Sequence, residues 1–463
     1  MSLKQLLLSS ALMLAATAAH AAQTTAATTV TDTPAQPALK QPPKALFPKF
    51  GDTLQDHGIN IGIVYTDLFL RNLATGLDRW KSANYGAVGY DVTLDLDKIA
   101  GIPDTKLNLI ITQNLLQENS SSYTFKVNNA FFPGIVTVTP TALNKLSVET
   151  GFFDRKLDVE IGRMSPTTNF FLPSYCGFCY ASTPAITLDQ PGITAAGVWG
   201  GRAEFDLDSQ NKFQAELAEN DGYVFQHTDG WYFSTRHANG YIGIASWQHK
   251  ETFQNSAYPA NWEIGAYRDS AEYDDPIYNV DGTSKIFNPA GKVLVHRDGT
   301  NGVYAQFRKV VWTGGARSFM GPETLALYGG TFITPGAGQS YPVEAYGGAE
   351  ITGFVPQSPL LMAGVGLQYI RLGDRRALYE QQIRMALGGA KVKTAQDMFA
   401  PNVHMRIPLT PFALLQPFAV YFINPNNAII PSRTEQKNGW FLGINLLVNI
   451  GGALGIDHSA PPM

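Results

Sequence analysis

Hydrophobic and polar side chains alternate along most of the chain with a period of two residues. The clearest case is the segment 439–450, GWFLGINLLVNI, in which every second residue from Trp440 to Ile450 is large and apolar. This is the period of a β-strand, whose successive side chains point to opposite faces. Alternation over this length exceeds that of an ordinary strand and is typical of a strand that crosses a bilayer at a tilt.

The same alternation recurs along the chain and predicts an all-β fold, a transmembrane antiparallel β-barrel of sixteen strands. An even number of strands is the rule for single-chain bacterial barrels. The predicted strands are 59–70, 84–97, 105–117, 146–154, 156–163, 194–208, 211–223, 239–248, 262–268, 302–313, 325–333, 343–354, 359–373, 399–409, 414–423 and 439–450.

The connections between the predicted strands alternate in length. Short connections follow even-numbered strands, as at 154–156 and 208–211, whereas long ones such as 118–145 and 269–301 follow odd-numbered strands. Short periplasmic turns and long extracellular loops are typical of outer-membrane barrels. A soluble β-sandwich has no reason to alternate in this way.

Polar residues on one face of the strands predict a water-filled interior. In the segment 200–208, the residues Arg202, Glu204, Asp206 and Asp208 alternate with small or apolar ones. Charges on one face of a single strand would also fit the solvated side of a sandwich. Their repetition along a chain with an export signal favours a polar lumen.

The first residues predict export. Residues 1–21 have a basic start at Lys4, an apolar core at 6–18 and a small-x-small cleavage site, as in a Sec signal peptide. Residues 22–50, rich in Ala, Thr and Pro, are expected to form a flexible periplasmic segment with a helical turn near 49–58. The barrel domain is expected to span 51–463, in the outer membrane of a Gram-negative cell.

The composition agrees with a barrel and excludes several classes of protein. Charged residues make up 16% of the chain, against about 25% in soluble domains. The net charge of −4 excludes a strongly basic nucleic-acid binder. After the signal peptide no stretch reaches eighteen apolar residues, so a barrel is the remaining way to span a membrane.

Both cysteines, Cys176 and Cys179, lie in one CGFC motif. In an oxidising compartment a disulfide between them is expected. A redox role would require a βαβ context, and a zinc site would require further ligands. We interpret the pair as a structural disulfide.

The long connection 164–193 contains many aromatic residues and prolines, and we expect it to fold into the lumen as a constriction. Its residues Phe170, Phe171 and Tyr175 could stack on the apolar C–H face of a pyranose. The alternative is an outward loop whose aromatic residues pack on each other.

Strand parity also predicts charged side chains inside the barrel. We expect Glu160, Arg202, Glu204 and Arg308 to face the lumen. Arg163 ends its strand just before the long connection, where it could point into the narrowest part of the lumen or cap that loop. Glu350 and Arg406 are assigned inward in the same way. Charges of mixed sign suit a neutral polyhydroxy solute. The alternative is a set of lumen salt bridges with no role in solute binding.

Four segments resemble the OprB-type carbohydrate-selective porins. They are VYTDLFLRNLATG (64–76), GYDVTLDLDKIAGIPDTKLNL (89–109), VEIGRMSP (159–166) and the closing pair of strands around Ile423-Asn424-Pro425 within 414–450. The resemblance implies a sixteen-stranded outer-membrane barrel that passes glucose and other small sugars by diffusion. It also implies a narrow eyelet of arginines, glutamates and aromatics.

The resemblance implies that Arg163, Arg202 and Glu204 belong to the eyelet. The resemblance also implies that the protein takes small sugars as solutes and contacts outer-membrane lipid but not nucleic acid. It further implies a monomer or a homotrimer. The sequence departs from the family pattern by continuing through 451–463 after its last strand.

Three other functions would also fit parts of this pattern. The first is a porin of general or small organic acid specificity, and the second is a structural outer-membrane protein with a plugged lumen. The third, a secreted enzyme or binding protein, would need a catalytic or metal-binding motif. The eight histidines are scattered and neither H-E-x-x-H nor G-x-S-x-G occurs. We therefore expect no enzymatic activity, no cofactor and no metal.

Overall fold

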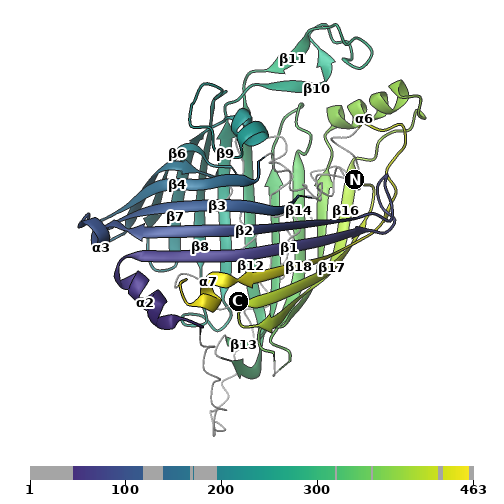
Figure 1. Cartoon of the computed structure of the whole chain (residues 1–463). Coiled ribbons are helices and arrows are strands. Elements are labelled where there is room, and N and C mark those ends of the chain that lie inside the picture. Colours follow the sequence, from purple (N-terminus) through teal and green to yellow (C-terminus); the bar gives the residue numbers. More distant parts are fainter. Residues whose placement is uncertain are drawn as a thin grey trace, which may run out of the picture. The chain divides into compact units, whose positions relative to one another are not determined.

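The structure, a computed structural model, describes residues 45–117, 139–166, 170, 196–318, 321–355, 358–425 and 431–457. Within this part of the chain, sixteen antiparallel strands close into a barrel in which β1 pairs with β18 (Figure 1). The barrel strands are β1 (Ile59–Asn72), β2 (Ser82–Asp95), β3 (Thr105–Gln117), β4 (Thr141–Phe152), β5 (Leu157–Met164), β6 (Val198–Asp206), β7 (Asn211–Glu219), β8 (Tyr241–Lys250), β9 (Ala260–Asp269), β12 (Thr300–Ser318), β13 (Gly321–Ile333), β14 (Val343–Thr352), β15 (Met362–Arg371), β16 (Asp397–Thr410), β17 (Ala413–Phe422) and β18 (Gly439–Asn449).

Each predicted strand corresponds to one barrel strand, so the predicted fold class is confirmed. The sequence pattern missed a separate two-stranded sheet, β10 (Tyr273–Asn279) and β11 (Val293–His296). Both strands lie within the connection 269–301 that was expected to be a loop. They are short and contain few alternating apolar residues, so the period-two signal is weak.

The two ends of the barrel differ as predicted. Short connections such as 153–156, 207–210 and 411–412 lie at one end, which we call the turn end. Long connections such as 270–299 and 372–396 lie at the other, the loop end. The turn end carries α2 (Pro48–Asp56), α3 (Leu96–Ala100) and α7 (Ile450–Leu454), and the loop end carries η3 (Val224–Thr228), the β10–β11 hairpin and α6 (Asp374–Ala386) (Figure 1).

The chain enters the barrel beside the place where it leaves. The N–H groups of Leu46 and Phe47 donate to the carbonyls of Ala453 and Leu454, at 2.8 and 3.0 Å. Gly455 ends α7 with a left-handed backbone, φ 82°, a conformation that favours glycine. Residues on both sides of the β1–β18 seam are therefore joined by main-chain hydrogen bonds. None of the described helices is long and apolar enough to cross a membrane.

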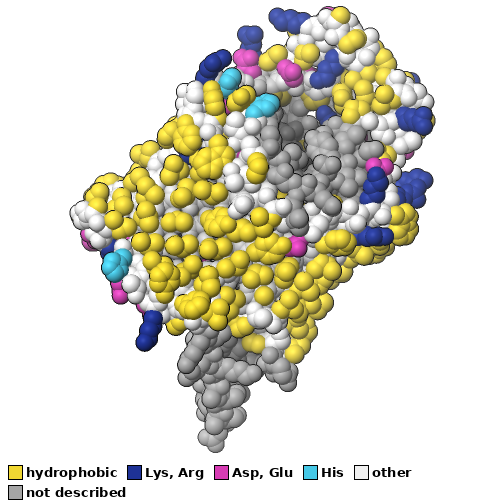
Figure 2. Space-filling model, in the orientation of Figure 1, with side chains coloured by type: hydrophobic (Ala, Val, Ile, Leu, Met, Phe, Trp, Pro, Cys, Tyr) yellow, Lys and Arg dark blue, Asp and Glu magenta, His cyan; other side chains and the backbone are white. Residues whose placement is uncertain are grey.

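The outer face of the barrel is apolar. Figure 2 shows hydrophobic side chains over the wall around β1, β2 and β18, with charged side chains gathered towards the two ends. Large exposed side chains that point outward include Val148, Ile161, Phe213, Leu217, Trp247, Ile264, Val303, Leu327, Val365, Val403, Met405, Leu442 and Ile444. A wall of this kind is stable against lipid, where every backbone polar group must be satisfied by strand pairing.

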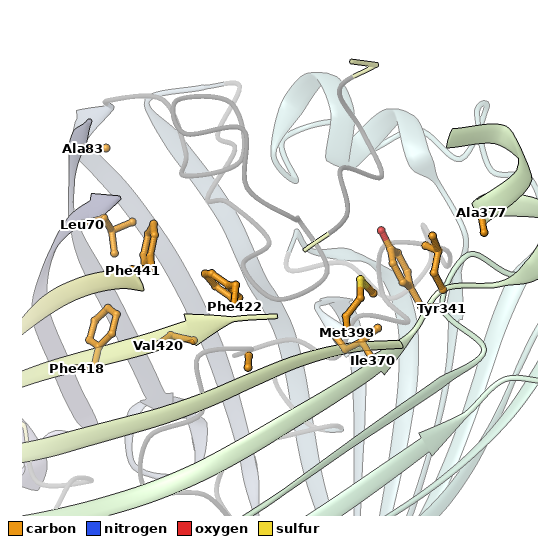
Figure 3. Packing of buried hydrophobic residues seen from close by; sticks show 12 residues of the cluster. Leu70, Ala83, Tyr341, Ile370, Ala377, Met398, Phe418, Val420, Phe422 and Phe441 are labelled. Carbon is orange, nitrogen blue, oxygen red and sulfur yellow. The ribbon is translucent and has the colours of Figure 1, made fainter. Parts of the chain in front are cut away.

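The inner face is apolar near the loop end. Leu70, Phe418, Phe422 and Phe441 pack in a cluster on the inner face of β1, β17 and β18, and Tyr341 extends it into the loops (Figure 3). A second apolar cluster covers the inner face of β6 to β13 and consists of Phe170, Ala196, Val198, Ala218, Val224, Ile242, Ile244, Tyr267, Tyr304 and Phe332. The polar side chains of the wall therefore lie nearer the turn end.

Several inward-pointing rings lie against a glycine of the neighbouring strand. The register pairs Phe418 with Gly443, and a Cβ on that glycine would overlap the phenyl ring. Gly302 makes room for Tyr267 in the same way. These glycines let bulky rings lie close to the wall instead of projecting across the lumen.

Candidate functional site

A network of charged side chains covers the inner face of β4 to β7. At its centre the Glu160 carboxylate accepts hydrogen bonds from Ser147 Oγ at 2.5 Å and from Arg202 Nη2 at 3.1 Å. Lys145 Nζ lies 2.9 Å from Glu160 Oε1, the same oxygen that accepts from Ser147 Oγ. Glu160 is 1% exposed, so its charge is held by these groups rather than by bulk water. We call this set the Glu160 network.

The Glu160 network continues along β6 and β7. Arg202 Nη1 lies 2.7 Å from Glu204 Oε2, and Glu204 also pairs with Lys212. Arg202 and Glu204 therefore each have oppositely charged partners on the same or the adjacent strand. These side chains present hydrogen-bond donors and acceptors, and charges of both signs.

A second polar network lies on the inner face of β12, β14 and β16. Glu350 forms an ion pair with Arg308, and His404 Nε2 lies 3.4 Å from Glu350 Oε1. Nearer the loop end, Glu263 accepts hydrogen bonds from Tyr304 Oη at 2.7 Å and from Gln306 Nε2 at 2.8 Å. We call Arg308, Glu350 and His404 the Glu350 network.

The two networks lie on nearly opposite sides of the barrel. In the strand order around the wall, β5 and β14 are seven positions apart. In a ring of sixteen strands, directly opposite strands are eight positions apart. The Glu160 network and the Glu350 network therefore face one another across the lumen.

Between these networks, on β1 to β3 and β18, the inner face carries mainly uncharged polar side chains that stay partly exposed. They include Thr66, Thr93, Asn108, Thr112 and Asn445. Thr93 Oγ1 donates to Asn108 Oδ1 at 3.3 Å, so neighbouring strands share these groups. We call this the uncharged polar sector. Among the described residues of these four strands, Asp91 is the one inward carboxylate that is exposed.

Several predicted site residues lie where strand parity placed them. Glu160, Arg202, Glu204 and Arg308 point inward and belong to the two networks. Phe170 is fully buried in the second apolar cluster, and its N–H donates to the Pro166 carbonyl at 3.1 Å. The remaining predicted loop residues lie outside the described residues: Phe171, Tyr175, Cys176 and Cys179.

Arg163 does not point into the lumen, the first of the two positions expected for it; its guanidinium donates instead to the Gly197 carbonyl, just after the long connection. Side chains an odd number of residues apart on a strand point to opposite faces, and Arg163 is three residues from the inward Glu160. The outward Ile161, 64% exposed, confirms this parity. The Arg163 guanidinium lies outside the lumen, 4.9 Å from the ring centroid of Phe233 and 5.6 Å from that of Trp199.

The structure adds inward groups that the sequence analysis did not single out, notably Lys145, Glu263 and His404. Lys145 lies just before the predicted strand 146–154, next to a bulge where the β3–β4 register shifts. A bulge breaks the period of two, which hides the start of the strand. For Glu263 and His404, the alternation of side chains along β9 and β16 would have been sufficient to assign an inward position.

At the loop end, the β10–β11 hairpin is fixed to α6 by a buried carboxylate. Asp275 accepts hydrogen bonds from the N–H groups of Ile277 and Tyr278, at 2.9 and 2.8 Å. His296 Nε2 lies 2.9 Å from Asp275 Oδ2, and Arg375 of α6 pairs with the same carboxylate. Burial alone would raise the pKa of Asp275, but these hydrogen bonds hold it below its usual value.

Within α6, Glu380 is expected to make the docking of the helix pH-dependent. Burial raises the pKa of Glu380 to about 7, although the positive charges of Arg376 and Arg384 act to lower it. A carboxyl with a raised pKa favours the folded helix at low pH, and this contribution is lost as the pH rises from 4.5 through about 7. Asp275, whose pKa is lowered, stays ionised throughout this range.

Hydrogen exchange of the α6 amides at about pH 5 and about pH 8, corrected for intrinsic rates, measures this effect. We expect lower protection at the higher pH in the natural protein and equal protection in Glu380→Gln, which cannot ionise. Equal protection at both values in the natural protein would contradict the assignment.

Comparisons with known proteins agree with this architecture. The family model described as carbohydrate-selective porin, OprB family, matches residues 80–449. The high-pH structure of Pseudomonas putida OprB superimposes with a TM-score of 0.73 at 16% identity, covering 86% of this chain and 95% of that one. The low-pH structure of the same protein gives 0.52 at 14% identity, covering 87% and 97%. No curated protein matches the sequence.

Proposed function

Since the chain belongs to the OprB family of carbohydrate-selective porins, we propose that its Glu160 network, Glu350 network and uncharged polar sector together form the path that small sugars follow. The protein is an outer-membrane porin that allows sugars to diffuse passively across the membrane. Its turn end lies at the periplasmic side and its loop end at the extracellular side.

The pairing of opposite charges along the inner wall is the observation that carries this proposal. Arg202 is shared between Glu160 and Glu204, and Arg308 pairs with Glu350. Such pairs present both donors and acceptors while their opposite charges limit the net field. Sugar hydroxyls both donate and accept, so they can replace water at these groups, whereas a simple ion gains from one sign only.

We propose that Arg202, Glu204 and Arg308, whose side chains stay partly exposed, contact the passing sugar, and that the buried Glu160 holds Arg202 in place. Arg163 is left out of this set because its guanidinium lies outside the lumen. A narrowing of the path by the aromatic loop 164–193, and its disulfide, stay predictions. So does the assembly as a monomer or homotrimer.

Single-channel conductance in planar bilayers tests the proposal, with glucose titrated first and a small organic acid second. We expect current steps that glucose blocks saturably. Arg308→Ala should weaken this block by roughly tenfold or more, because hydrogen bonds to charged groups contribute about 1.5–3 kcal/mol. Lys309→Ala is the matched control, since Lys309 is the next residue on β12, faces outward and donates to the Tyr258 carbonyl.

The alternative outcomes are distinct. Block by the acid alone would favour a porin for small organic acids. Equal glucose block in Arg308→Ala and the natural protein would remove Arg308 from the path. A folded, heat-modifiable barrel without conductance would exclude transport and favour a structural role.

A further inference from the structure

One part of the loop end carries an excess of positive charge. Arg71 is the last outward residue of β1, and Arg79 and Lys81 lie in the connection from β1 to β2. Lys437, which precedes β18, is held close to this connection because the N–H of Gly76 donates to its carbonyl at 3.0 Å. All four basic side chains are exposed. We call Arg71, Arg79, Lys81 and Lys437 the basic rim.

Within the described residues, the charge of the basic rim is only partly balanced by its own chain. Its one ion pair there joins Lys81 Nζ to Asp78 Oδ2 at 3.7 Å, and both side chains are partly exposed, so water weakens the attraction. The outward arginines of β15 and β9 differ, because Arg371 Nη1 lies 3.2 Å from Asp397 Oδ1 and Arg268 donates two hydrogen bonds, at 2.9 and 3.1 Å. Positive charge is therefore concentrated on one side of the loop end.

Between Arg79 and Lys81 lies a tryptophan with a strained backbone. Trp80 has φ 65°, in the left-handed region, and is 65% exposed. Its N–H donates to the Asn72 carbonyl at 2.8 Å, while the Asn72 N–H donates to the Lys81 carbonyl at 2.9 Å, which makes Trp80 the first residue of a β-bulge. Glycine usually takes this left-handed position, because a side chain strains it. Since the indole is largely exposed, burial does not offset the strain, which points to a contact outside the chain.

The basic rim lies where the apolar outer wall ends. The register pairs Arg71 with the outward Leu442 of β18. Next along β18, the outward Trp440 forms an edge-to-face pair with Tyr421 of β17, with ring centroids 5.2 Å apart. Figure 2 shows Lys and Arg side chains gathered at the loop-end edge of the wall over β1 and β18. Because tryptophan and tyrosine are enriched where a bilayer meets water, we place the basic rim at the level of the lipid head groups.

We propose that the basic rim and Trp80 bind a lipid of the outer leaflet whose head group carries phosphates. Arginine and lysine both complement phosphate oxygens, and the planar guanidinium can donate to two of them at once. The indole of Trp80 has an apolar ring for the lipid and an N–H for the head group. The apolar wall contacts any lipid, whereas this site selects its lipid by the charge of the head group.

Native mass spectrometry of the whole protein in a neutral detergent tests the site, with added lipid A that carries two phosphates. Arg79→Ala combined with Lys81→Ala should weaken binding about thirtyfold, because each basic residue near an anionic head group contributes about fivefold. Arg268→Ala combined with Arg371→Ala is the matched control, since it removes the same charge from bonded positions, and it should bind as the natural protein does. Monophosphoryl lipid A should bind several-fold more weakly.

Three results would overturn the proposal. They are an equal loss of binding in the two double variants, no loss in either, and displacement of lipid A by inorganic phosphate at equal concentration. The last would indicate a site for the free ion. Heat modifiability on gels confirms that each barrel is folded. The measurement does not depend on the passage of sugars, so it stands apart from the test of the proposed transport function.

Substitution of Trp80 by glycine supplies a second readout. Trp80→Gly relieves the strain of the left-handed backbone and removes the indole. We expect lipid A to bind several-fold more weakly, while the stability of the barrel to urea stays equal or rises. The opposite pair of results, lower stability with unchanged binding, would show that Trp80 serves the fold alone and would overturn its part in the proposal.

Discussion

Replacement of Glu350 by alanine is expected to lower the free energy of unfolding by about 3 kcal/mol, the lower end of the range for breaking a buried ion pair. The carboxylate is 1% exposed and pairs with Arg308, while His404 lies on its other side. Its removal leaves the cationic Arg308 without its partner. The lower end applies because the Arg308 side chain is 22% exposed and water can solvate part of its charge.

The same substitution should change the ion preference of the channel. With Glu350 neutral, the charge of Arg308 is no longer balanced, so the path attracts anions more strongly. Urea unfolding of the refolded barrel and the reversal potential in a salt gradient measure the two effects. Glu350→Gln, which keeps the volume and one acceptor, should lose less stability but shift the reversal potential equally. An unchanged potential in both variants would place Glu350 outside the conducting path.

Replacement of Gly443 by valine is expected to destabilise the closing seam by about 3 kcal/mol, the upper end of the range for overpacking. Gly443 lies on β18, directly opposite Phe418 of β17, whose ring occupies the space that a Cβ would need. Phe418 is itself packed in the apolar cluster with Phe441 and Val420 (Figure 3). The ring therefore cannot swing away without disturbing its neighbours.

A double substitution isolates the cause of this effect. Phe418→Ala in the Gly443→Val background should recover part of the lost stability, because the alanine leaves room for the new side chain. Urea unfolding of all four proteins gives the coupling energy between the two positions. If the effects of the two substitutions simply add, the ring is not the obstacle and the destabilisation has another origin.

The barrel could be predicted from the sequence because its physical signal is local and repeated. An outward apolar and an inward polar residue alternate in strand after strand, as in 200–208, and loop lengths alternate between the two ends. The same parity rule correctly places Glu160, Arg202 and Arg308 inside. Applied strictly, it would also have placed Arg163 outside.

The partners of the inward side chains could not be predicted in this way. The contact of Lys145 with Glu160 depends on a bulge that shifts the β3–β4 register, and bulges leave no period in the sequence. The ion pair of Asp275 with Arg375 joins β10 to α6, which belong to two connections far apart in the chain. Such contacts depend on how loops pack, which local patterns of polarity do not encode.

The hydrogen bonds between the two chain ends bear on the order in which the barrel assembles. β1 pairs with β18, and Leu46 and Phe47 bond to residues that follow β18. The first strand to leave the export machinery therefore keeps an unpaired edge until the last strand arrives. Because pairing between strands so far apart in the chain is slow, we expect the edge of β1 to stay open to other strand edges for longest, and its pairing with β18 to be the last step of barrel folding.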